Sequence, residues 1–345
     1  DRDGYLWLGT PSGGLSRFDG QTFRTFTTAD GLVSNQVHSV LHARDGSMWI
    51  GTKDGVSHYD GLTFTNYKDE GWVRGYEIRV IIQDRDGDIW FATEGGGVTR
   101  YDGETFRQFT PDDGLADLDV FAPLEDRNGV MWFGSRGGGM TRYDGETWTT
   151  YTAADGLANN LVWSSMEDRE GHLWFGCEGG VSRYDGETFV NFTSADGLPD
   201  APVYRIVEDR QGRFWFGTAR GLYRFDGRRF HHDTLTGFVP SSFEDRDGQL
   251  WFGTSDGVSR YSEQSVTTFD IAASFKPQWI APHKQDRDGR LLFGGIFGGG
   301  VLRYDGQTWT AYESANGRTL SGAVLADRQG RYWLGTQGSG VVRYD

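Results

Sequence analysis

The chain alternates between short apolar runs, four to six residues long, and turns rich in Asp and Gly. One such run is His172–Cys177, and Val181–Tyr184, Thr188–Phe192 and Pro202–Val207 follow it with turns or loops between them. Aromatic and β-branched residues dominate these runs, and almost no segment sustains the 3.6-residue period of an amphipathic helix. The pattern therefore predicts four short β-strands in succession, with Asp185-Gly186 as a tight type I′ hairpin turn.

This four-strand unit repeats along the whole chain. The motif Asp-Arg-x-Gly, with Ala in place of Asp in the second copy, begins at residues 1, 43, 84, 126, 168, 209, 245, 286 and 327. A tryptophan follows each motif glycine by three positions, except where Leu292 takes its place. A period this regular indicates a repeat architecture in which each unit packs against its neighbours. We expect the recurring indoles to form the structural core: Trp7, Trp49, Trp90, Trp132, Trp174, Trp215, Trp251 and Trp333.

Strands with apolar residues at both alternate positions must be covered on both faces. Radial stacking of four-stranded blades achieves this, so we predict an all-β fold, a single β-propeller domain over residues 1–345. A β-sandwich gives no reason for a 41-residue period, and a parallel β-helix usually has shorter coils. The first unit lacks its first strand and the last lacks its fourth, which predicts 34 strands. We favour about nine blades, with eight, or a ring distorted between eight and nine, as the alternative.

The composition limits the possible partners. The chain is acidic, with a formal net charge of −15 and a pI of about 4.9. Nucleic acid and anionic membrane surfaces are bound by clustered Lys and Arg, so we expect neither as a partner. The single cysteine, Cys177, excludes an intramolecular disulfide, and we expect it to be buried and unreactive. No run of 18 apolar residues occurs, and the chain opens in the middle of a repeat, so we expect a domain of a longer protein that does not itself insert into a membrane.

The repeat resembles that of a known family. The string E-D-R-x-G-x-x-W-F-G-T-x-G-G-[VLM]-x-R-Y-D-G, carried by Glu167–Cys177 with Val181–Gly186 and again at Glu125–Gly145 and Glu244–Tyr261, is similar to the two-component regulator propeller repeat. The resemblance implies the ligand-binding sensor part of a bacterial hybrid two-component or related signalling protein, joined to other domains of its parent protein. It also implies a location outside the cytoplasmic membrane, with the cytoplasm as the alternative, and a small molecule or an oligosaccharide as ligand.

The turns and glycine-rich stretches invite interpretation as metal or phosphate sites. Asp-Arg-Asp-Gly carries carboxylates at alternate positions, but it has neither the length nor the distal Glu of an EF-hand loop. We interpret it as a structural turn that the Asp caps, with the Arg paired to a nearby carboxylate. The triple glycines, such as Gly95–Gly97, lack a following helix and a Gly-Lys-Ser/Thr motif. The seven histidines show no metal-ligand spacing, so the sequence predicts neither a metal nor a cofactor.

Three functions stay open. The resemblance favours a non-catalytic sensor or recognition propeller that binds a saccharide. A protein–protein interaction scaffold is the first alternative. The second is a metal-dependent lyase, because the string D-G-x-[IL]-W-F-x-[TE] also resembles the blades of antibiotic-inactivating lyases related to virginiamycin B lyase. Glu94 and Glu178 lie in loops where the groups of such an enzyme would project, but no histidine occupies a repeat-equivalent loop position. We therefore expect no enzymatic activity and assign no catalytic residue.

Ligand-binding residues are expected where the repeat is violated. In propellers, the loops between consecutive blades and the turns between second and third strands share one face, where ligands bind. Aromatic rings beside carboxylates suit sugars, whose C–H faces stack on such rings, although the same rings could fill the core of irregular blades. The candidates are the additional aromatic and basic residues of that face: Trp72, Arg74, Tyr76, Trp163, Tyr204, Phe238, Phe275, Lys276, Trp279 and Phe297.

Overall fold

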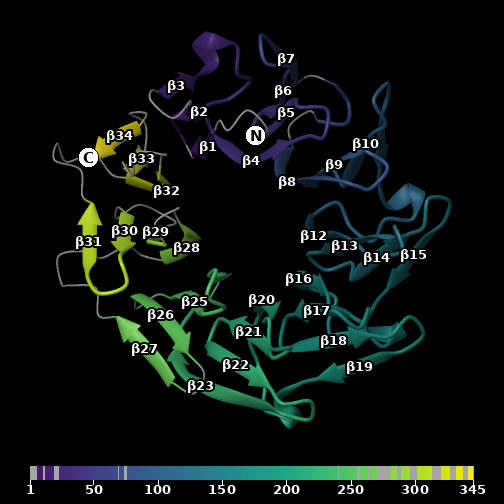
Figure 1. Ribbon diagram of the computed structural model, residues 1–345. Helices are drawn as coiled ribbons and strands as arrows, with labels where there is room; N and C mark the ends of the chain where they lie inside the picture. The colour runs from purple at the N-terminus through teal and green to yellow at the C-terminus, as the bar shows by residue number, and fades with distance from the viewer. Residues whose placement is uncertain are drawn as a thin grey trace. The chain divides into compact units, whose positions relative to one another are not determined.

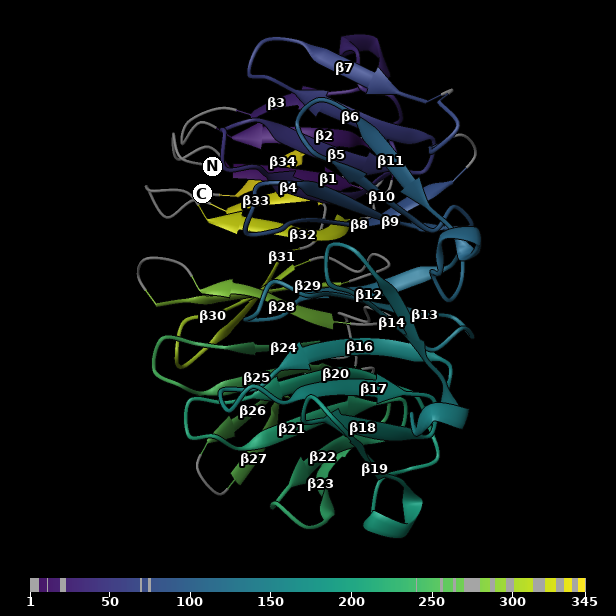
Figure 2. The same cartoon turned by 90° about the vertical axis from the view of Figure 1, so that its right-hand side faces the viewer.

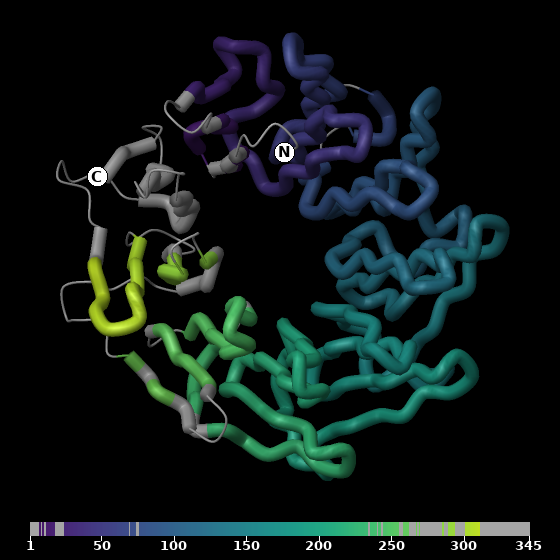
Figure 3. The backbone as a smooth tube through the Cα atoms, in the orientation of Figure 1, coloured from purple at the N-terminus to yellow at the C-terminus, as the bar shows by residue number. Residues whose placement is uncertain are grey.

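The computed structural model describes most of the chain, and Figure 3 follows its backbone. By compactness the chain divides into unit 1, which comprises Asp1–Thr52, Ser57–Asn66 and Gly237–Asp345, and unit 2, which comprises Lys53–Val56 and Tyr67–Thr236. That residues 1–345 form one continuous domain stays a prediction. The described residues are 6–10, 12–18, 23–68, 70–73, 76–239, 241–254, 257–262, 265–269, 280–285, 289–295, 301–312, 320–326, 332–336 and 341–344.

Unit 2 contains four sheets, each of four antiparallel strands paired in chain order (Figure 1). In each sheet the first strand leads into the Asp-Arg turn and the second carries the repeated tryptophan, as predicted. The strands are β8 (Glu77–Gln83), β9 (Ile89–Glu94), β10 (Val98–Tyr101), β11 (Phe106–Phe109), β12 (Val120–Glu125), β13 (Met131–Ser135), β14 (Met140–Tyr143), β15 (Trp148–Tyr151), β16 (Val162–Glu167), β17 (Leu173–Cys177), β18 (Gly180–Tyr184), β19 (Phe189–Phe192), β20 (Val203–Glu208), β21 (Phe214–Thr218), β22 (Gly221–Phe225) and β23 (Phe230–Thr236).

The remaining strands form five sheets, almost entirely within unit 1. They are β1 (Leu6–Thr10), β2 (Gly14–Phe18), β3 (Phe23–Phe26), β4 (Val37–His42), β5 (Met48–Thr52), β6 (Gly55–Tyr59), β7 (Phe64–Tyr67), β24 (Ser241–Glu244), β25 (Leu250–Thr254), β26 (Gly257–Ser262), β27 (Ser265–Phe269), β28 (Ile280–Gln285), β29 (Leu291–Gly295), β30 (Val301–Tyr304), β31 (Trp309–Tyr312), β32 (Leu320–Ala326), β33 (Tyr332–Thr336) and β34 (Val341–Tyr344).

The incomplete repeats at the two chain ends form separate three-stranded sheets. The first, β1-β2-β3, lacks the first strand of a blade, and the last, β32-β33-β34, lacks the fourth. Within unit 1, β1 lies beside β32 and β33. The described residues therefore contain the 34 strands that the repeat predicts, and the fold is that of a β-propeller built from four-stranded blades.

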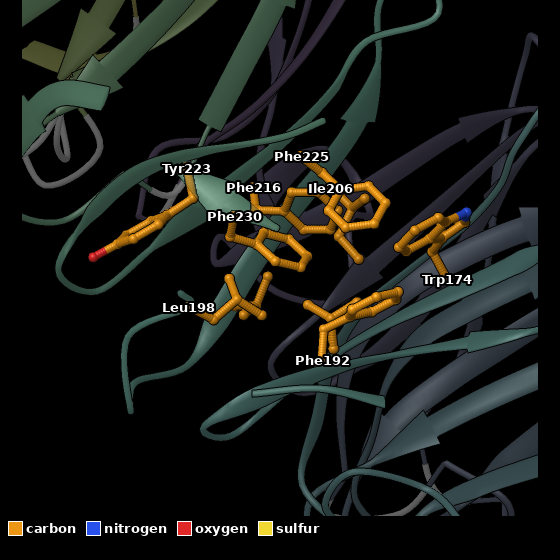
Figure 4. Close-up of a cluster of buried hydrophobic side chains, with 10 residues drawn as sticks. Trp174, Phe192, Leu198, Ile206, Phe216, Tyr223, Phe225 and Phe230 are labelled. Atoms are coloured by element: carbon orange, nitrogen blue, oxygen red, sulfur yellow. The ribbon is translucent and has the colours of Figure 1, made fainter. Parts of the chain in front are cut away.

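The repeated tryptophan fills the space between one sheet and the next. Trp174 of β17 stacks on Phe192 of its own sheet, with ring centroids 5.8 Å apart and planes inclined by 12°. On its other side it contacts Phe216 and Phe225 of the following sheet, each at 5.8 Å (Figure 4). The predicted burial is confirmed for six of the repeated tryptophans: Trp49, Trp90, Trp132, Trp174, Trp215 and Trp251.

The remaining predictions for the core concern Trp7, Trp333 and Cys177. Trp7 is partly buried and contacts Phe26 and Tyr59. Leu292, which replaces the tryptophan in its unit, is buried, whereas the side chain of Trp333 lies outside the described residues. Cys177 is fully buried, as predicted, and burial raises the pKa of its thiol to about 12.

In five of the described repeats, the Asp-Arg turn is tied to the tryptophan that follows it. Asp84 Oδ1 accepts hydrogen bonds of 2.9–3.1 Å from the backbone N–H groups of Asp86, Gly87 and Asp88. Its other oxygen, Oδ2, accepts one of 2.7 Å from Trp90 Nε1. The carboxylate thus caps the turn, as predicted, and also satisfies an indole N–H that is buried away from water. The same indole bond, of 2.8–3.0 Å, joins Asp126 to Trp132, Asp168 to Trp174, Asp209 to Trp215 and Asp245 to Trp251.

The arginine of the turn reaches the next sheet. Arg85 Nε donates to Glu125 Oε1 over 2.6 Å, and the backbone N–H of Arg85 donates to Oε2 of the same residue over 2.9 Å. Equivalent pairs are Arg127–Glu167 and Arg169–Glu208. An exposed ion pair of this kind contributes at most about 1 kcal/mol, so these pairs align neighbouring sheets more than they stabilise them. The predicted pairing of the motif arginine with a carboxylate is confirmed.

The hairpin between the third and fourth strands is longer than predicted. Tyr184 pairs with Phe189, so the loop holds the four residues Asp185–Thr188 and not the two of a type I′ turn. Asp185 Oδ1 accepts hydrogen bonds from the N–H groups of Glu187 and Thr188, over 2.9 and 2.8 Å. The loop also needs one residue in the left-handed conformation. Gly186, with a φ of 103°, takes it without steric cost.

Acid is expected to destabilise the protein through these loops. Hydrogen bonds from the N–H groups of Thr188 and Glu187 lower the pKa of Asp185 to about 2, and bonds from Thr308 lower the pKa of Asp305 to about 2. Since an unfolded Asp has a pKa of about 3.9, the stabilisation is present above about pH 4 and is lost as the pH falls towards about 2. The Tm should therefore decrease between about pH 5 and 2, and less so in the double variant Asp185→Asn, Asp305→Asn. Equal pH profiles for parent and variant would contradict this account.

Four loops between consecutive sheets contain one turn of 3₁₀ helix, and the described residues contain no α-helix. In η3, Thr152 and Asp155 form a capping box, and Gly156 follows with a φ of 106°. Leu157, the next residue, is 2% exposed. The repeated Asp-Gly-Leu sequence therefore closes the cap and inserts a leucine into the core. The four turns are η1 (Thr28–Asp30), η2 (Pro111–Asp113), η3 (Ala153–Asp155) and η4 (Ser194–Asp196).

Candidate ligand-binding site

A β-bulge interrupts the first strand of each sheet in unit 2. In β16, Val162 pairs with Cys177 and Ser164 with Gly176, which leaves Trp163 as the additional residue. A bulge turns such a side chain out of the regular alternation of the strand. The preceding Val or Ile is buried in every case, whereas the bulge residues are partly buried or exposed. In β8, β12 and β20 the equivalent bulge residues are Arg79, Phe121 and Tyr204.

The turn between the second and third strands places another side chain beside the bulge. This turn packs against the loops that link the sheets: the N–H of Glu178 donates to the carbonyl of Leu161 over 3.0 Å, and that of Gly179 to the carbonyl of Ala201 over 3.1 Å. The two kinds of loop therefore share one face of unit 2, as predicted, and Figure 2 shows the sheets from the side. We call the bulge and turn residues together the first-strand row: Arg79, Glu94, Phe121, Arg136, Trp163, Glu178 and Tyr204.

One half of the first-strand row is aromatic. The ring of Trp163 lies between those of Phe121 and Tyr204, with centroids 6.3 and 5.4 Å away and planes inclined by 42° and 55°. Trp163 Nε1 donates a hydrogen bond of 3.0 Å to Glu178 Oε2. Burial, and to a smaller extent the charge of Glu178, raises the pKa of Tyr204. Three rings from three successive sheets thus lie next to one another, and the middle ring bonds to a carboxylate.

The other half of the row is ionic. Arg79 Nε donates to Glu94 Oε2 over 2.9 Å, and Nη2 of the same arginine lies 2.9 Å from Glu77 Oε2. Arg136 Nη1 lies 3.6 Å from Glu94 Oε1. The guanidinium carbon of Arg136 also lies 5.4 Å from the ring centroid of Phe121. Arg136 therefore joins the ionic half to the aromatic half, and the row is continuous across four sheets.

The structure brings two of the predicted ligand-binding residues together and places two others in packing roles. Trp163 and Tyr204 are neighbours in the first-strand row. Tyr76 packs on the glycine-rich turn, because a Cβ atom on Gly96 would lie 2.3 Å from its ring. Trp72, by contrast, packs in the core. It is 8% exposed and stacks on Phe106, with ring centroids 4.5 Å apart and planes inclined by 11°.

Of the remaining predicted residues, the structure describes only one. Phe238 is partly buried and belongs to unit 1. The others lie outside the described residues: Arg74, Phe275, Lys276, Trp279 and Phe297.

Sequence reasoning missed Arg79, Phe121 and Arg136, and it named Glu94 and Glu178 only as possible groups of a lyase. The signal that identifies the bulge residues is positional. Each directly follows a buried Val or Ile at the first or second position of a first strand, at the spacing of the repeat, and yet the residue type changes from sheet to sheet. His38 occupies the same position in β4, in unit 1. A variable residue inside a uniform repeat is therefore the feature to search for.

The described residues show neither a metal-binding cluster nor a membrane-spanning helix. No group of three or more His, Cys, Asp or Glu side chains among them is arranged to hold a metal ion. Nor is any helix in that part of the chain both long enough and apolar enough to cross a membrane.

Comparison with known proteins identifies the repeat. The sequence model of the family described as "Two component regulator propeller" matches residues 31–54, 73–95, 156–179, 197–220 and 235–256. Each match contains the first and second strands of one sheet and the Asp-Arg turn between them. None of the curated proteins compared with the chain matches it.

Solved structures share the fold at low sequence identity. PorZ, a surface component of the type-IX secretion system of Porphyromonas gingivalis, has a TM-score of 0.55 and 17% identity over 99% of this chain and 57% of its own. A catalytically inactive histidine-to-alanine variant of virginiamycin B lyase from Staphylococcus aureus, solved with quinupristin, has a TM-score of 0.53 and 14% identity over 98% of this chain and 97% of its own.

A third similar structure comes from B. thetaiotaomicron and is described as the extracellular domain of a hybrid two component system. It has a TM-score of 0.44 and 20% identity, and the match covers 99% of this chain and 60% of that domain. This chain therefore spans about three fifths of the length of that domain. The chain therefore contains repeats of the two component regulator propeller family.

Proposed function

We propose that this chain is the ligand-recognition propeller of a bacterial signalling protein, that it lies outside the cytoplasmic membrane, and that it binds a saccharide without transforming it. The single observation that carries the proposal is the first-strand row. It consists of the side chains that depart from an otherwise uniform repeat, and they adjoin one another across four sheets of unit 2. The family resemblance supports the location and the connection to further domains of a parent protein.

The chemistry of the row suits a sugar. A pyranose has apolar C–H faces that stack on aromatic rings and hydroxyl groups that both donate and accept hydrogen bonds. Phe121, Trp163 and Tyr204 offer the rings. Glu94 and Glu178 offer acceptors, and the arginines offer donors fixed by ion pairs. Because these groups come from successive sheets, an extended ligand of several sugar units would contact more of them than a single sugar.

A lyase activity finds less support in the same residues. The related fold of virginiamycin B lyase is described with a histidine whose replacement by alanine abolishes catalysis. The first-strand row contains no histidine, and its carboxylate Glu94 is held by two arginines. These features favour recognition over catalysis.

A glycan array, followed by isothermal titration calorimetry, tests the proposal. The variant Trp163→Ala should lose at least about tenfold in affinity for the saccharide that the parent binds, since removing one stacking ring at a binding site costs at least about 1.4 kcal/mol. The control is Trp148→Ala, which removes a partly buried ring from β15, outside the row. It should lower the Tm and leave the affinity unchanged. No saccharide binding, together with a stable protein partner in pull-down experiments, would favour an interaction scaffold instead.

A further inference from the structure

The carboxylates of the first-strand row differ in their partners. Glu94 lies within ion-pairing distance of both Arg79 and Arg136. Glu178 accepts a hydrogen bond from Trp163 Nε1 over 3.0 Å. No basic side chain of the described residues lies within 4.0 Å of it. Among the described residues, the aromatic half of the row therefore contains a carboxylate that no basic side chain pairs with.

The surroundings of Glu178 make that charge significant. The residue is partly buried, so water screens its charge less than at the open surface. It also adjoins the indole of Trp163, and aromatic faces attract cations through their quadrupole. The row already contains one such contact, since the guanidinium of Arg136 lies over the ring of Phe121 at 5.4 Å. A positively charged group of a ligand would make the equivalent contact with the ring of Trp163.

We propose that the saccharide bound by the first-strand row carries a protonated amine, placing its ammonium group against Glu178 and the ring of Trp163. The ligand class is thus a cationic amino sugar. This inference rests on the proposed function. An ammonium offers three N–H donors, and Glu178 Oε1 together with the remaining lone pairs of Oε2 can accept them while the indole bond is kept.

Other substituents fit this position less well. A hydroxyl group can donate one hydrogen bond to Glu178 but leaves its charge uncompensated. An N-acetyl group offers a single N–H and no charge. A sugar carboxylate would be repelled at this position, as two like charges are. The inference therefore predicts an order of affinity among sugars that differ in one substituent.

Three oligosaccharides of equal length and identical β-1,4 linkage provide the test: those of glucosamine, N-acetylglucosamine and glucose. Affinities are measured by calorimetry in mildly acidic buffer, where the amine is protonated. The glucosamine oligomer should bind at least about tenfold more tightly than the glucose oligomer, and Glu178→Gln should remove this preference. The matched control is Glu170→Gln, which changes the net charge equally at a side chain of the same sheet that is 83% exposed. It should keep the preference.

The outcomes separate the two proposals. Equal or tighter binding of the glucose or N-acetylglucosamine oligomer overturns the inference and leaves the proposed function standing. An equal loss of preference in Glu170→Gln and Glu178→Gln also overturns it, because the effect would then reflect net charge alone. If no saccharide of the array binds, the proposed function and the inference both fail.

Discussion

Replacing Trp174 by alanine is expected to lower the free energy of unfolding by roughly 3–5 kcal/mol, the cost of truncating a large buried aromatic residue. Trp174 is 1% exposed and contacts Phe192 in its own sheet and Phe216 in the next. Its loss would leave a cavity between two sheets and would remove the indole donor from Asp168. Urea denaturation followed by intrinsic fluorescence and circular dichroism measures the change.

Two further variants make this expectation specific. Trp174→Phe keeps a ring in the cavity but loses the bond to Asp168 Oδ2, so it should cost roughly 1–3 kcal/mol. Trp163→Ala also removes a tryptophan side chain, but from the preceding strand of the same sheet, where the ring is only partly buried. It should cost about 1–2 kcal/mol, because less apolar surface returns to water. If Trp163→Ala were as destabilising as Trp174→Ala, burial between sheets would not be the source of stability.

Replacing Gly139 by alanine is expected to be comparably damaging, although it adds a single methyl group. Gly139 has a φ of 94°, and a Cβ atom there would lie 2.2 Å from the carbonyl oxygen of Tyr151. The left-handed conformation costs a residue other than glycine about 1–2 kcal/mol, and forcing an additional carbon into a packed site costs roughly 1–3 kcal/mol more. The Tm and the urea midpoint should both fall. The affinity for ligand should fall as well, because Gly139 ends the turn that carries Arg136.

Gly145 provides the matched control for this substitution. It belongs to the same sheet and has a similar φ of 100°, but apart from its chain neighbours no residue lies within 4 Å of the position that a Cβ would take. Gly145→Ala should therefore cost only the conformational strain, about 1–2 kcal/mol. Equal destabilisation by the two substitutions would mean that strain alone accounts for the effect and that the contact with Tyr151 is relieved by a small shift.

Most of the fold could be predicted from the sequence, because recurrence of the same pattern decides whether an individual segment forms a strand or a helix. A single run such as Leu173–Cys177 could be a strand or part of a buried helix, but its recurrence next to the same turn in every unit removes the second possibility. The strand number and the incomplete end sheets follow from the same counting. The Asp–Trp hydrogen bond could also have been inferred, because an Asp and a Trp six residues apart, as Asp168 and Trp174 are, recur in five of the complete repeats.

The hairpin and the first-strand row were harder to predict, for different reasons. The sequence predicts a two-residue turn because Asp-Gly is typical of type I′ turns. The loop Asp185–Thr188 has four residues instead, and the Asp185 carboxylate accepts hydrogen bonds from N–H groups within it. Trp72 and Trp163 appeared equivalent as additional tryptophans, yet one stacks in the core and the other lies at a bulge. A bulge reverses the alternation of inward and outward side chains, and hydrophobic pattern alone does not reveal where that reversal occurs.

By itself, the sequence determined the repeating unit, its four strands, its turns and the tryptophan that six of its copies bury. These depend on neighbouring residues and on a period that every copy repeats. Only the tertiary structure decided which variable side chains meet. Phe121, Trp163 and Tyr204 are about one repeat apart in the chain, and they become neighbours because bulged first strands of successive sheets pack side by side. Proximity of that kind is a property of packed sheets, which no single segment of sequence contains.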